Sequence, residues 1–264
     1  MGLLAETKFL LRMNRIFPKK LLGQNFLVEP LIFQRMIDYA MVCNKDVVLE
    51  IGAGFGFLTR FLASKCGRVL AVEFDTRLAK VLREQLKDLT NIQIIEGDIL
   101  KAAIPEFSKV VSVPPYHISS RLLLWLLNRS FDCAVLVFQR EFVDRLVASV
   151  GSGDYGWLAV LAYYYVEVEL LDDVPRVMFY PQPKVDSVVV RLKPKKPRPF
   201  ALENEELFKR LVRLLFTQRN KKVRNAISVF LKNTHSGTVV PFCDKRVREL
   251  APEDFGVLAN ALNV

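Results

Sequence analysis

The sequence predicts an α/β protein whose mostly parallel sheet is covered by helices on both faces, followed by a small all-helical C-terminal domain. Three observations predict it. Short runs rich in Val, Leu and Ile alternate with helical segments, a glycine-rich turn directly follows the first run, and a basic, proline-rich segment precedes the helical patterns that end the chain. Continuous apolar runs separated by helices are typical of parallel strands that are buried on both faces.

The elements alternate in order along the chain. Helices are predicted over residues 31–41, 58–63, 76–86, 119–127 and 141–147, and strands over 46–51, 68–73, 92–95, 110–113 and 134–138. Parallel strands need such crossover helices between them. Two later strands, over 158–169 and 185–192, have little helix between them, and we expect them to add antiparallel strands at one edge of the sheet.

A domain boundary is predicted at residues 193–200 (KPKKPRPF), where three Pro and four basic residues are typical of an extended linker. The first domain then covers residues 1–192, with an N-terminal extension over 1–30, and the second covers 201–264. Apolar residues recur at helical spacing in the second domain. They form three stripes: Leu207, Leu211, Leu214 and Leu215; Val223, Ala226, Ile227, Phe230 and Leu231; and Phe255, Leu258, Ala259 and Leu262.

The positive charge is concentrated in the last part of the chain. The 264 residues carry a net charge of +10, of which residues 191–264 contribute +9 and residues 1–190 only +1. Clustered positive charge favours a polyanionic partner such as a nucleic acid. The longest uncharged stretch, residues 155–166, is too short to span a bilayer, and four Cys without a CxxC pair indicate neither a zinc module nor a disulfide framework. We therefore expect a cytoplasmic, monomeric protein without a structural metal.

A nucleotide pocket is predicted at the carboxyl ends of the first three strands. Gly52, Gly54 and Gly56 follow the first strand and allow a ligand to approach the backbone closely. The third Gly of the dinucleotide fingerprint would stand at position 57, which is Phe57, and this disfavours NAD. Glu73 ends the second strand, where it could accept hydrogen bonds from ribose hydroxyls, and Asp98 follows the third, where it could accept from an adenine amino group.

The pattern Glu50-x-Gly52-x-Gly54-x-Gly56 resembles the S-adenosylmethionine site of Rossmann-like methyltransferases. The chain as a whole resembles the KsgA/Dim-type family of small-subunit rRNA adenine dimethyltransferases, in its archaeal branch. The motifs that carry this resemblance are Gly23-Gln24-Asn25-Phe26-Leu27, the glycine motif, Glu73, Gly97-Asp98, Pro115-Tyr116 with Ile118-Ser119-Ser120, Phe138-Gln139 with Glu141, Phe179 to Ser187, and Phe216 to Lys222.

The resemblance implies a protein that binds S-adenosylmethionine and methylates N6 of adenines in small-subunit rRNA, once or twice, during ribosome biogenesis. Its partner would be the small ribosomal subunit. The cofactor site would consist of Gln24, Asn25, Leu27, Glu50, Gly52, Gly54, Gly56, Glu73, Asp98 and Val113. Candidates for contacts with RNA phosphates are Lys19, Lys20, Arg219, Lys221, Lys222 and Arg224.

The acceptor motif departs from the family pattern. The family has Asn-(Leu/Ile)-Pro-(Tyr/Phe), whereas this chain has Val113-Pro114-Pro115-Tyr116, its candidate catalytic residues. Tyr116 can still stack on an extruded adenine and the Pro114 carbonyl can still accept a hydrogen bond from N6, but Val113 offers no side-chain acceptor. By analogy with an oxyanion hole, losing one oriented partner costs on the order of 10²-fold in rate.

Three interpretations of this departure are open. Ser112 substitutes for the missing acceptor, although strand alternation directs it to the opposite face; the protein methylates slowly or only once per adenine; or it is an inactive rRNA-binding assembly factor. We favour retained activity because Glu73, Asp98 and Tyr116 are all present. Methylation of large-subunit rRNA is a further alternative. His117, which follows Tyr116, is expected to line the loop rather than to act in catalysis.

Overall fold

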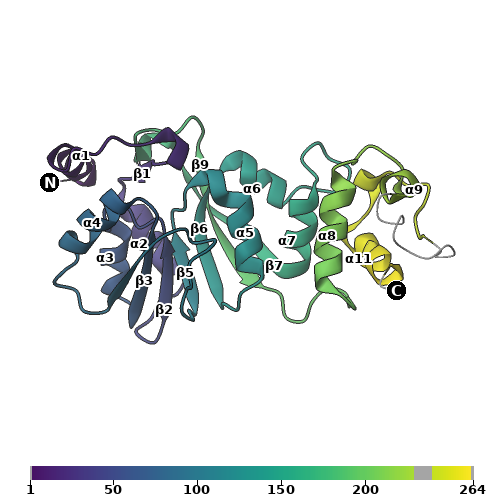
Figure 1. Ribbon diagram of the computed structural model, residues 1–264, viewed down its shortest axis with the longest axis horizontal. Helices are drawn as coiled ribbons and strands as arrows, with labels where there is room; N and C mark the ends of the chain where they lie inside the picture. The colour runs from purple at the N-terminus through teal and green to yellow at the C-terminus, as the bar shows by residue number, and fades with distance from the viewer. Residues whose placement is uncertain (1, 229–239, 263–264) are drawn as a thin grey trace. The chain divides into compact units, whose positions relative to one another are not determined.

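The computed structural model describes residues 2–228 and 240–262, except for the side chain of Lys20 (Figure 1). The chain forms two compact units. The first consists of Met1–Val143 with Glu169–Pro194, and the second of Asp144–Val168 with Lys195–Val264. In the described part of the chain, no helix is both long and apolar enough to span a membrane.

The first unit is built around a sheet with helices before and between its strands. Its helical elements are α1 (Leu3–Met13), η1 (Lys20–Leu22), α2 (Pro30–Tyr39), α3 (Phe57–Ala63), α4 (Thr76–Gln85), η2 (Tyr116–Ile118), α5 (Ser119–Leu127) and η3 (Arg176–Met178). Its strands are β1 (Phe26–Leu27), β2 (Val47–Ile51), β3 (Arg68–Glu73), β4 (Ile92–Glu96), β5 (Lys109–Ser112), β6 (Cys133–Gln139), β8 (Phe179–Tyr180) and β9 (Ser187–Pro194). Two elements, α6 (Arg140–Leu146) and β7 (Val166–Val174), lie partly in each unit.

The main sheet has the strand order β4-β3-β2-β5-β6-β9-β7, and Figure 1 shows β3, β2, β5 and β6 in succession. The first five strands pair in parallel, whereas β9 pairs antiparallel with β6. The predicted strands over 46–51 through 134–138 are therefore confirmed, as is the antiparallel addition over 185–192. A separate pair, β1 and β8, joins Phe26 and Leu27 to Tyr180 and Phe179.

The central strands β2, β3, β5 and β6 are buried on both faces, as the continuous apolar runs predicted. One face shares a core with α2, α3 and α4, to which the strands contribute Val48, Val69, Ala71, Val111 and Val135. The alternating residues, such as Leu49, Leu70 and Leu136, point to the other face and are also fully buried. The carboxyl ends of β2 to β5 are thereby held at one edge of a rigid layer.

One strand prediction was wrong. Residues 158–165 belong to the helix α7 (Trp157–Tyr165), and only β7, which begins at Val166, is a strand. Most of α7 is buried, including Leu158, Leu161 and Tyr165, so its sequence carries no helical stripe of polar residues. The run Tyr163 to Tyr165 therefore does not lie on an edge strand as we expected.

The second unit joins α7 to the C-terminal helices α8 (Glu205–Phe216), α9 (Val223–Ala226), η4 (Val247–Glu249) and α11 (Pro252–Ala261). Both α8 and α11 pack on α7. The tail is thus helical as predicted, but its compact unit also takes in a segment that precedes the proline-rich residues 193–200. Phe230 and Leu231, from the second predicted stripe, lie outside the described residues.

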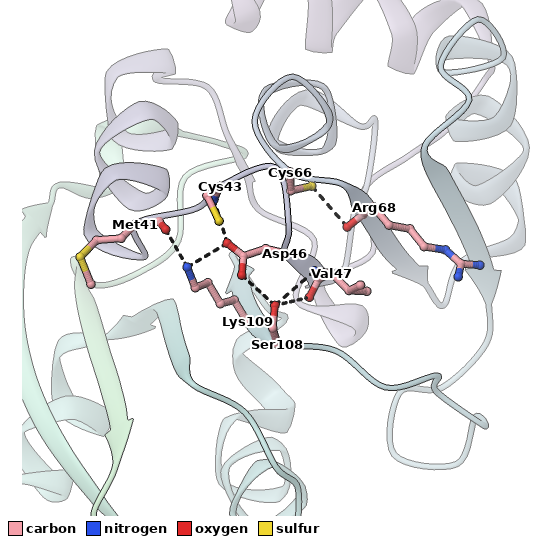
Figure 2. A network of polar contacts seen from close by, with 8 residues as sticks. All are labelled: Met41, Cys43, Asp46, Val47, Cys66, Arg68, Ser108 and Lys109. Atoms are coloured by element: carbon pink, nitrogen blue, oxygen red, sulfur yellow. Dashed lines mark hydrogen bonds and ion pairs between the residues drawn. The ribbon is translucent and has the colours of Figure 1, made fainter.

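A buried ion pair connects the starts of β2 and β5, as Figure 2 shows. Lys109 Nζ lies 2.8 Å from Asp46 Oδ2 and also donates to the Met41 carbonyl at 2.6 Å. Asp46 accepts further hydrogen bonds from Cys43 N at 2.8 Å and Ser108 Oγ at 3.0 Å. Burial disfavours the charge on Asp46, but these donors outweigh it and hold the pKa of this carboxyl below its usual value.

We expect Asp46→Ala to lower the free energy of unfolding by about 2 kcal/mol, because it leaves the mostly buried Lys109 without its counter-ion. The pKa of Asp46 is lower in the folded state than in the unfolded state, so the ionised carboxylate stabilises the fold. This stabilisation is complete above the unfolded pKa of about 3.9 and is lost as the pH falls through the lower folded pKa. Urea denaturation at several pH values measures both effects. Glu96→Ala, which breaks the more exposed pair of Glu96 with Arg83, is the control and should cost less than about 1 kcal/mol.

Candidate active site

A cavity of about 260 Å³ lies in the first unit at the carboxyl ends of β2, β3, β4 and β5. The structure brings most of the predicted cofactor and catalytic residues together in its lining. These are Gln24, Asn25, Gly52, Gly54, Glu73, Asp98, Val113, Pro114, Pro115 and Tyr116. Leu27 and Glu50 instead line a smaller cavity beside it, which also includes Asn25, Gly52, Gly54 and Val113.

The first two glycines of the motif form the floor of the cavity. Gly52 has φ +78°, and a Cβ atom there would lie 3.1 Å from Pro115 Cδ. Gly54 has φ +58°, and a Cβ atom would meet the Phe26 ring at 3.3 Å. Gly56 lines neither cavity: its Cβ would lie 2.7 Å from Leu82, so this glycine allows α3 to pack closely on α4. Gly52 and Gly54 line the cavity, and their lack of a Cβ atom lets Pro115 and Phe26 pack against this turn.

Glu73 is buried and fixed by two backbone donors. Its Oε2 accepts from Gly54 N and its Oε1 from Asp75 N, both at 2.8 Å. Burial raises the pKa of the Glu73 carboxyl, although these bonds oppose the shift. Because a carboxylate oxygen can accept two hydrogen bonds, Glu73 can accept from further donors in addition to these backbone groups. Asp98, after β4, accepts from Leu100 N at 3.0 Å through Oδ1.

Gln24 connects the N-terminal segment to the start of α4. Its Nε2 donates to Asp75 Oδ2 at 2.9 Å, and its Oε1 accepts from Lys19 N at 2.7 Å. Arg77 also pairs with Asp75, and together with Gln24 it holds the pKa of the Asp75 carboxyl well below its usual range. Gln24 thus positions residues 19–24 at the cavity through Asp75, a residue that was not predicted from the sequence.

Tyr116 is held in a single orientation. Its hydroxyl lies 2.7 Å from Ser187 Oγ, and its ring meets that of Phe179 edge-on, with 6.3 Å between centroids. Burial raises the pKa of Tyr116 to about 12, so the phenol is uncharged at neutral pH. A fixed, neutral aromatic ring that lines a cavity can serve as a stacking platform for a base.

The hydroxyl of Ser112 forms hydrogen bonds within the sheet. Its hydroxyl donates to the Ile51 carbonyl at 2.6 Å and accepts from Ile51 N at 3.1 Å, and the residue is fully buried. These contacts with β2 agree with the expected orientation away from the cavity. Ser112 is therefore a poor substitute for the acceptor that Val113 lacks.

Several cavity residues were not predicted from the sequence. Besides Asp75, they include Leu22, Phe26, Phe74, Ile99 and Arg121. His117 lines the cavity as expected. Burial and the nearby Arg121 lower the pKa of His117, while Asp98 opposes the shift. Phe26 belongs to the motif Gly23 to Leu27 and could have been predicted as a cavity residue from it. Arg121 belongs to none of the motifs that predicted the site.

Three of the six candidate RNA contacts have intramolecular partners. Arg219 donates to the carbonyls of Gly153 at 2.7 Å and Ser152 at 2.9 Å. Lys222 and Arg224 both pair with Asp244, at 3.1 and 2.9 Å. Lys19 and Lys221 are exposed. The side chain of Lys20 lies outside the described part of the structure.

Comparison with known proteins identifies the family. Residues 17–256 match the family model described as ribosomal RNA adenine dimethylase. The chain belongs to this family. Among similar members of the ribosomal RNA adenine dimethylase family, the probable ribosomal RNA small subunit methyltransferase A of Methanosarcina acetivorans is 40% identical over 90% of this chain and 91% of its own length. The protein of the same name from Thermococcus kodakarensis is 41% identical over 90% of this chain and 88% of its own.

Two solved structures agree with this membership. A dimethyladenosine transferase from Plasmodium falciparum superposes with a TM-score of 0.74 and 29% identity, covering 86% of this chain and 93% of the other. The 23S rRNA methyltransferase ErmE superposes with a TM-score of 0.65 and 30% identity, covering 91% of this chain and 100% of the other. The predicted Rossmann-like methyltransferase fold is therefore confirmed for this member of the adenine dimethylase family.

The cavity has the features that an adenosine-based cofactor requires. Two carboxylates at neighbouring strand ends offer acceptors for hydroxyl and amino groups, and a loop without Cβ atoms at Gly52 and Gly54 leaves the backbone accessible. The aromatic ring of Tyr116 lines the same cavity. The residues present thus fit both a nucleoside cofactor and a second, stacked base.

Proposed function

We propose that this protein transfers methyl groups from S-adenosylmethionine to N6 of adenines in small-subunit ribosomal RNA. The observation that carries the proposal is the placement of Glu73, Asp98, the Gly52–Gly54 turn and Tyr116 around one cavity. Membership of the ribosomal RNA adenine dimethylase family and the names of the archaeal relatives support the choice of reaction and substrate.

The cofactor would be held by hydrogen bonds from its adenosine portion. Glu73 would accept from both ribose hydroxyls through the free positions on its two oxygens, and Asp98 would accept from the adenine amino group. When bound, S-adenosylmethionine supplies a methyl group on a positively charged sulfur. Gln24, through its bond to Asp75, would keep the segment before Asn25 against the cavity.

The acceptor adenine would be positioned by the motif after β5. Tyr116 would stack on the extruded base, with its ring fixed by Ser187 and Phe179, and the Pro114 carbonyl would accept a hydrogen bond from N6. This bond would orient the weakly nucleophilic amine toward the methyl group. Val113 adds no side-chain acceptor, so we propose that the transfer step is slower than it would be with Asn at this position.

The RNA would dock mainly through the basic C-terminal residues. Arg219, Lys222 and Arg224 already pair within the protein, so we propose that Arg219 mainly shapes the surface and that Lys221 binds an RNA phosphate directly. The contribution of each cation would be measured by the salt dependence of RNA binding, since neutralising a cation that binds one phosphate lowers the slope by about one.

Incubation of the protein with labelled S-adenosylmethionine and immature small ribosomal subunits tests the proposal. We expect labelled N6-methyladenosine or N6,N6-dimethyladenosine when the RNA is digested and the nucleosides are analysed by mass spectrometry. Tight subunit binding without any methylated adenine would instead support a non-enzymatic assembly factor. In a parallel reaction with large ribosomal subunits, label that appears only in large-subunit rRNA would redirect the substrate assignment to that subunit.

We expect Tyr116→Ala to lower the methylation rate at saturating RNA by about 30-fold, because stacking on an aromatic ring contributes about 1–3 kcal/mol per base. Affinity for S-adenosylhomocysteine should change less than threefold. Tyr116→Phe keeps the ring and removes only the hydroxyl that meets Ser187, so its rate should stay within a fewfold of the wild type. Equal losses in both variants would contradict the stacking role.

A further inference from the structure

Arg121 places a positive charge in the lining of an otherwise acidic cavity. Among the described residues that line the main cavity, Arg121 is the only Lys or Arg, whereas Glu73, Asp75 and Asp98 carry carboxyl groups. His117 also lines the cavity, but burial and the charge of Arg121 lower its pKa, so this imidazole is uncharged at neutral pH. The lasting positive charge of the described lining therefore comes from Arg121.

Arg121 is exposed, and within the described part of the chain its guanidinium has no hydrogen bond, ion pair or ring contact. By contrast, Arg77 on α4 pairs with the cavity residue Asp75. Arg121 is also the third residue of α5, and the first turn of a helix carries a partial positive charge that disfavours a cation. A bound anion would offset this repulsion and supply the missing partner.

The position of Arg121 favours a phosphate of the substrate over the carboxylate of the cofactor. After the larger effect of burial, Arg121 and Asp98 both affect the pKa of His117, so both lie near this imidazole. In the proposed function Asp98 holds the adenine of the cofactor, whose carboxylate is at the opposite, methionine end. Arg121 instead lies in the first turn of the helix that follows Tyr116, on which the acceptor base would stack.

An extruded adenine would bring phosphates to this part of the cavity. The base enters the cavity, but the ribose–phosphate backbone stays outside, with one phosphate on each side of the extruded nucleotide. The three carboxylic acids of the lining would repel these phosphates. A guanidinium can bind a phosphate through two parallel hydrogen bonds, so one exposed Arg in the lining can fix the backbone there.

We propose that Arg121 binds a backbone phosphate beside the extruded adenine and thereby aligns the base on Tyr116. The inference rests on the proposed function, in which ribosomal RNA is the substrate, and it assigns the phosphate contact at the reacting nucleotide to the first unit. The basic C-terminal residues proposed above do not line this cavity, so they would contribute to affinity without positioning the base.

Binding of immature small ribosomal subunits at several salt concentrations, with saturating S-adenosylhomocysteine, tests the contact. We expect Arg121→Gln to weaken binding about tenfold and to lower the slope of log affinity against log salt by about one. Arg121→Lys keeps the charge without the planar fork, so it should retain the slope and most of the affinity. Lys65→Gln removes the same charge from an exposed residue between α3 and β3, at the opposite edge of the sheet, and should change neither quantity.

Calorimetry with S-adenosylhomocysteine separates a substrate contact from a cofactor contact. Its affinity should change less than about twofold in Arg121→Gln, whereas kcat/KM for methylation should fall about as much as subunit binding. Weaker binding of S-adenosylhomocysteine would show that Arg121 acts on the cofactor, and an unchanged slope would show that it binds no phosphate; either result would overturn the inference. A wild-type protein that neither binds S-adenosylhomocysteine nor methylates adenine would instead reject the proposed function, and the inference with it.

Discussion

Replacement of Glu73 by Gln should weaken binding of S-adenosylhomocysteine by about 10³-fold. Both oxygens of Glu73 accept from backbone N–H groups, of Gly54 and Asp75, so an amide in its place must direct its NH₂ group at one of these donors. The glycine turn or the start of α4 then has to move. The amide oxygen can keep one of the two proposed hydrogen bonds to the ribose hydroxyls. Loss of the other, at about 1.5–3 kcal/mol, together with a buried backbone donor that faces the NH₂ group, at about 1–3 kcal/mol, accounts for an effect of this size.

Isothermal titration calorimetry on the purified variant measures this effect, and circular dichroism checks that the variant is folded. Glu96→Gln serves as the control, because Glu96 lies opposite Glu73 on the neighbouring strand but lines neither cavity. If Glu73→Gln bound the ligand within threefold of the wild type, the assignment of the ribose site would be wrong.

The substitution Val113→Asn should raise the methylation rate by about 10²-fold. It would supply the side-chain acceptor that Val113 lacks, at a position that lines both cavities. A second acceptor would hold the N6 amine in line with the methyl group, an effect comparable to one donor in an oxyanion hole. Affinity for S-adenosylhomocysteine should change much less than the rate.

Single-turnover rates with saturating cofactor and immature subunits measure this gain. Val113→Leu alters the size of the side chain without adding an acceptor and should not raise the rate. An unchanged rate in Val113→Asn would mean that the chain positions the amine by other groups, and the explanation of the missing acceptor would then be wrong.

The parallel sheet could be predicted from sequence because each of its strands is a short apolar run that ends at a turn. The run over residues 46–51 leads directly into Gly52, and that over 68–73 ends at Glu73, so the position of the cavity followed from the strand ends alone. The helix α7 could not be recognised in this way. It is buried on nearly all sides, and without a polar face its sequence has no period that distinguishes a helix from a strand.

The site shows the same division between local and long-range information. Gly52, Gly54, Glu73 and Tyr116 lie in short motifs whose local geometry places them in the cavity. The bond between Gln24 and Asp75 joins residues 51 positions apart, and no spacing rule predicts it. Pairing of Arg219 with the carbonyls of residues 152 and 153 likewise depends on the tertiary packing of the second unit, and charge alone does not predict it.

The second unit is built from two separate stretches of the chain, and this limits how its role can be tested by truncation. The polypeptide passes between the two units three times, after Val143, Val168 and Pro194, so no single cut separates them. A truncated chain that stopped at residue 194 would retain α7 but lose α8 and α11, which pack on it, and Tyr164 and Tyr165 would lose their contacts with Phe208 and Glu205. Such a fragment would be prone to aggregate, and its failure to bind ribosomal subunits would say nothing about the basic residues it lacks. Charge-neutralising point substitutions in the intact chain avoid this confusion.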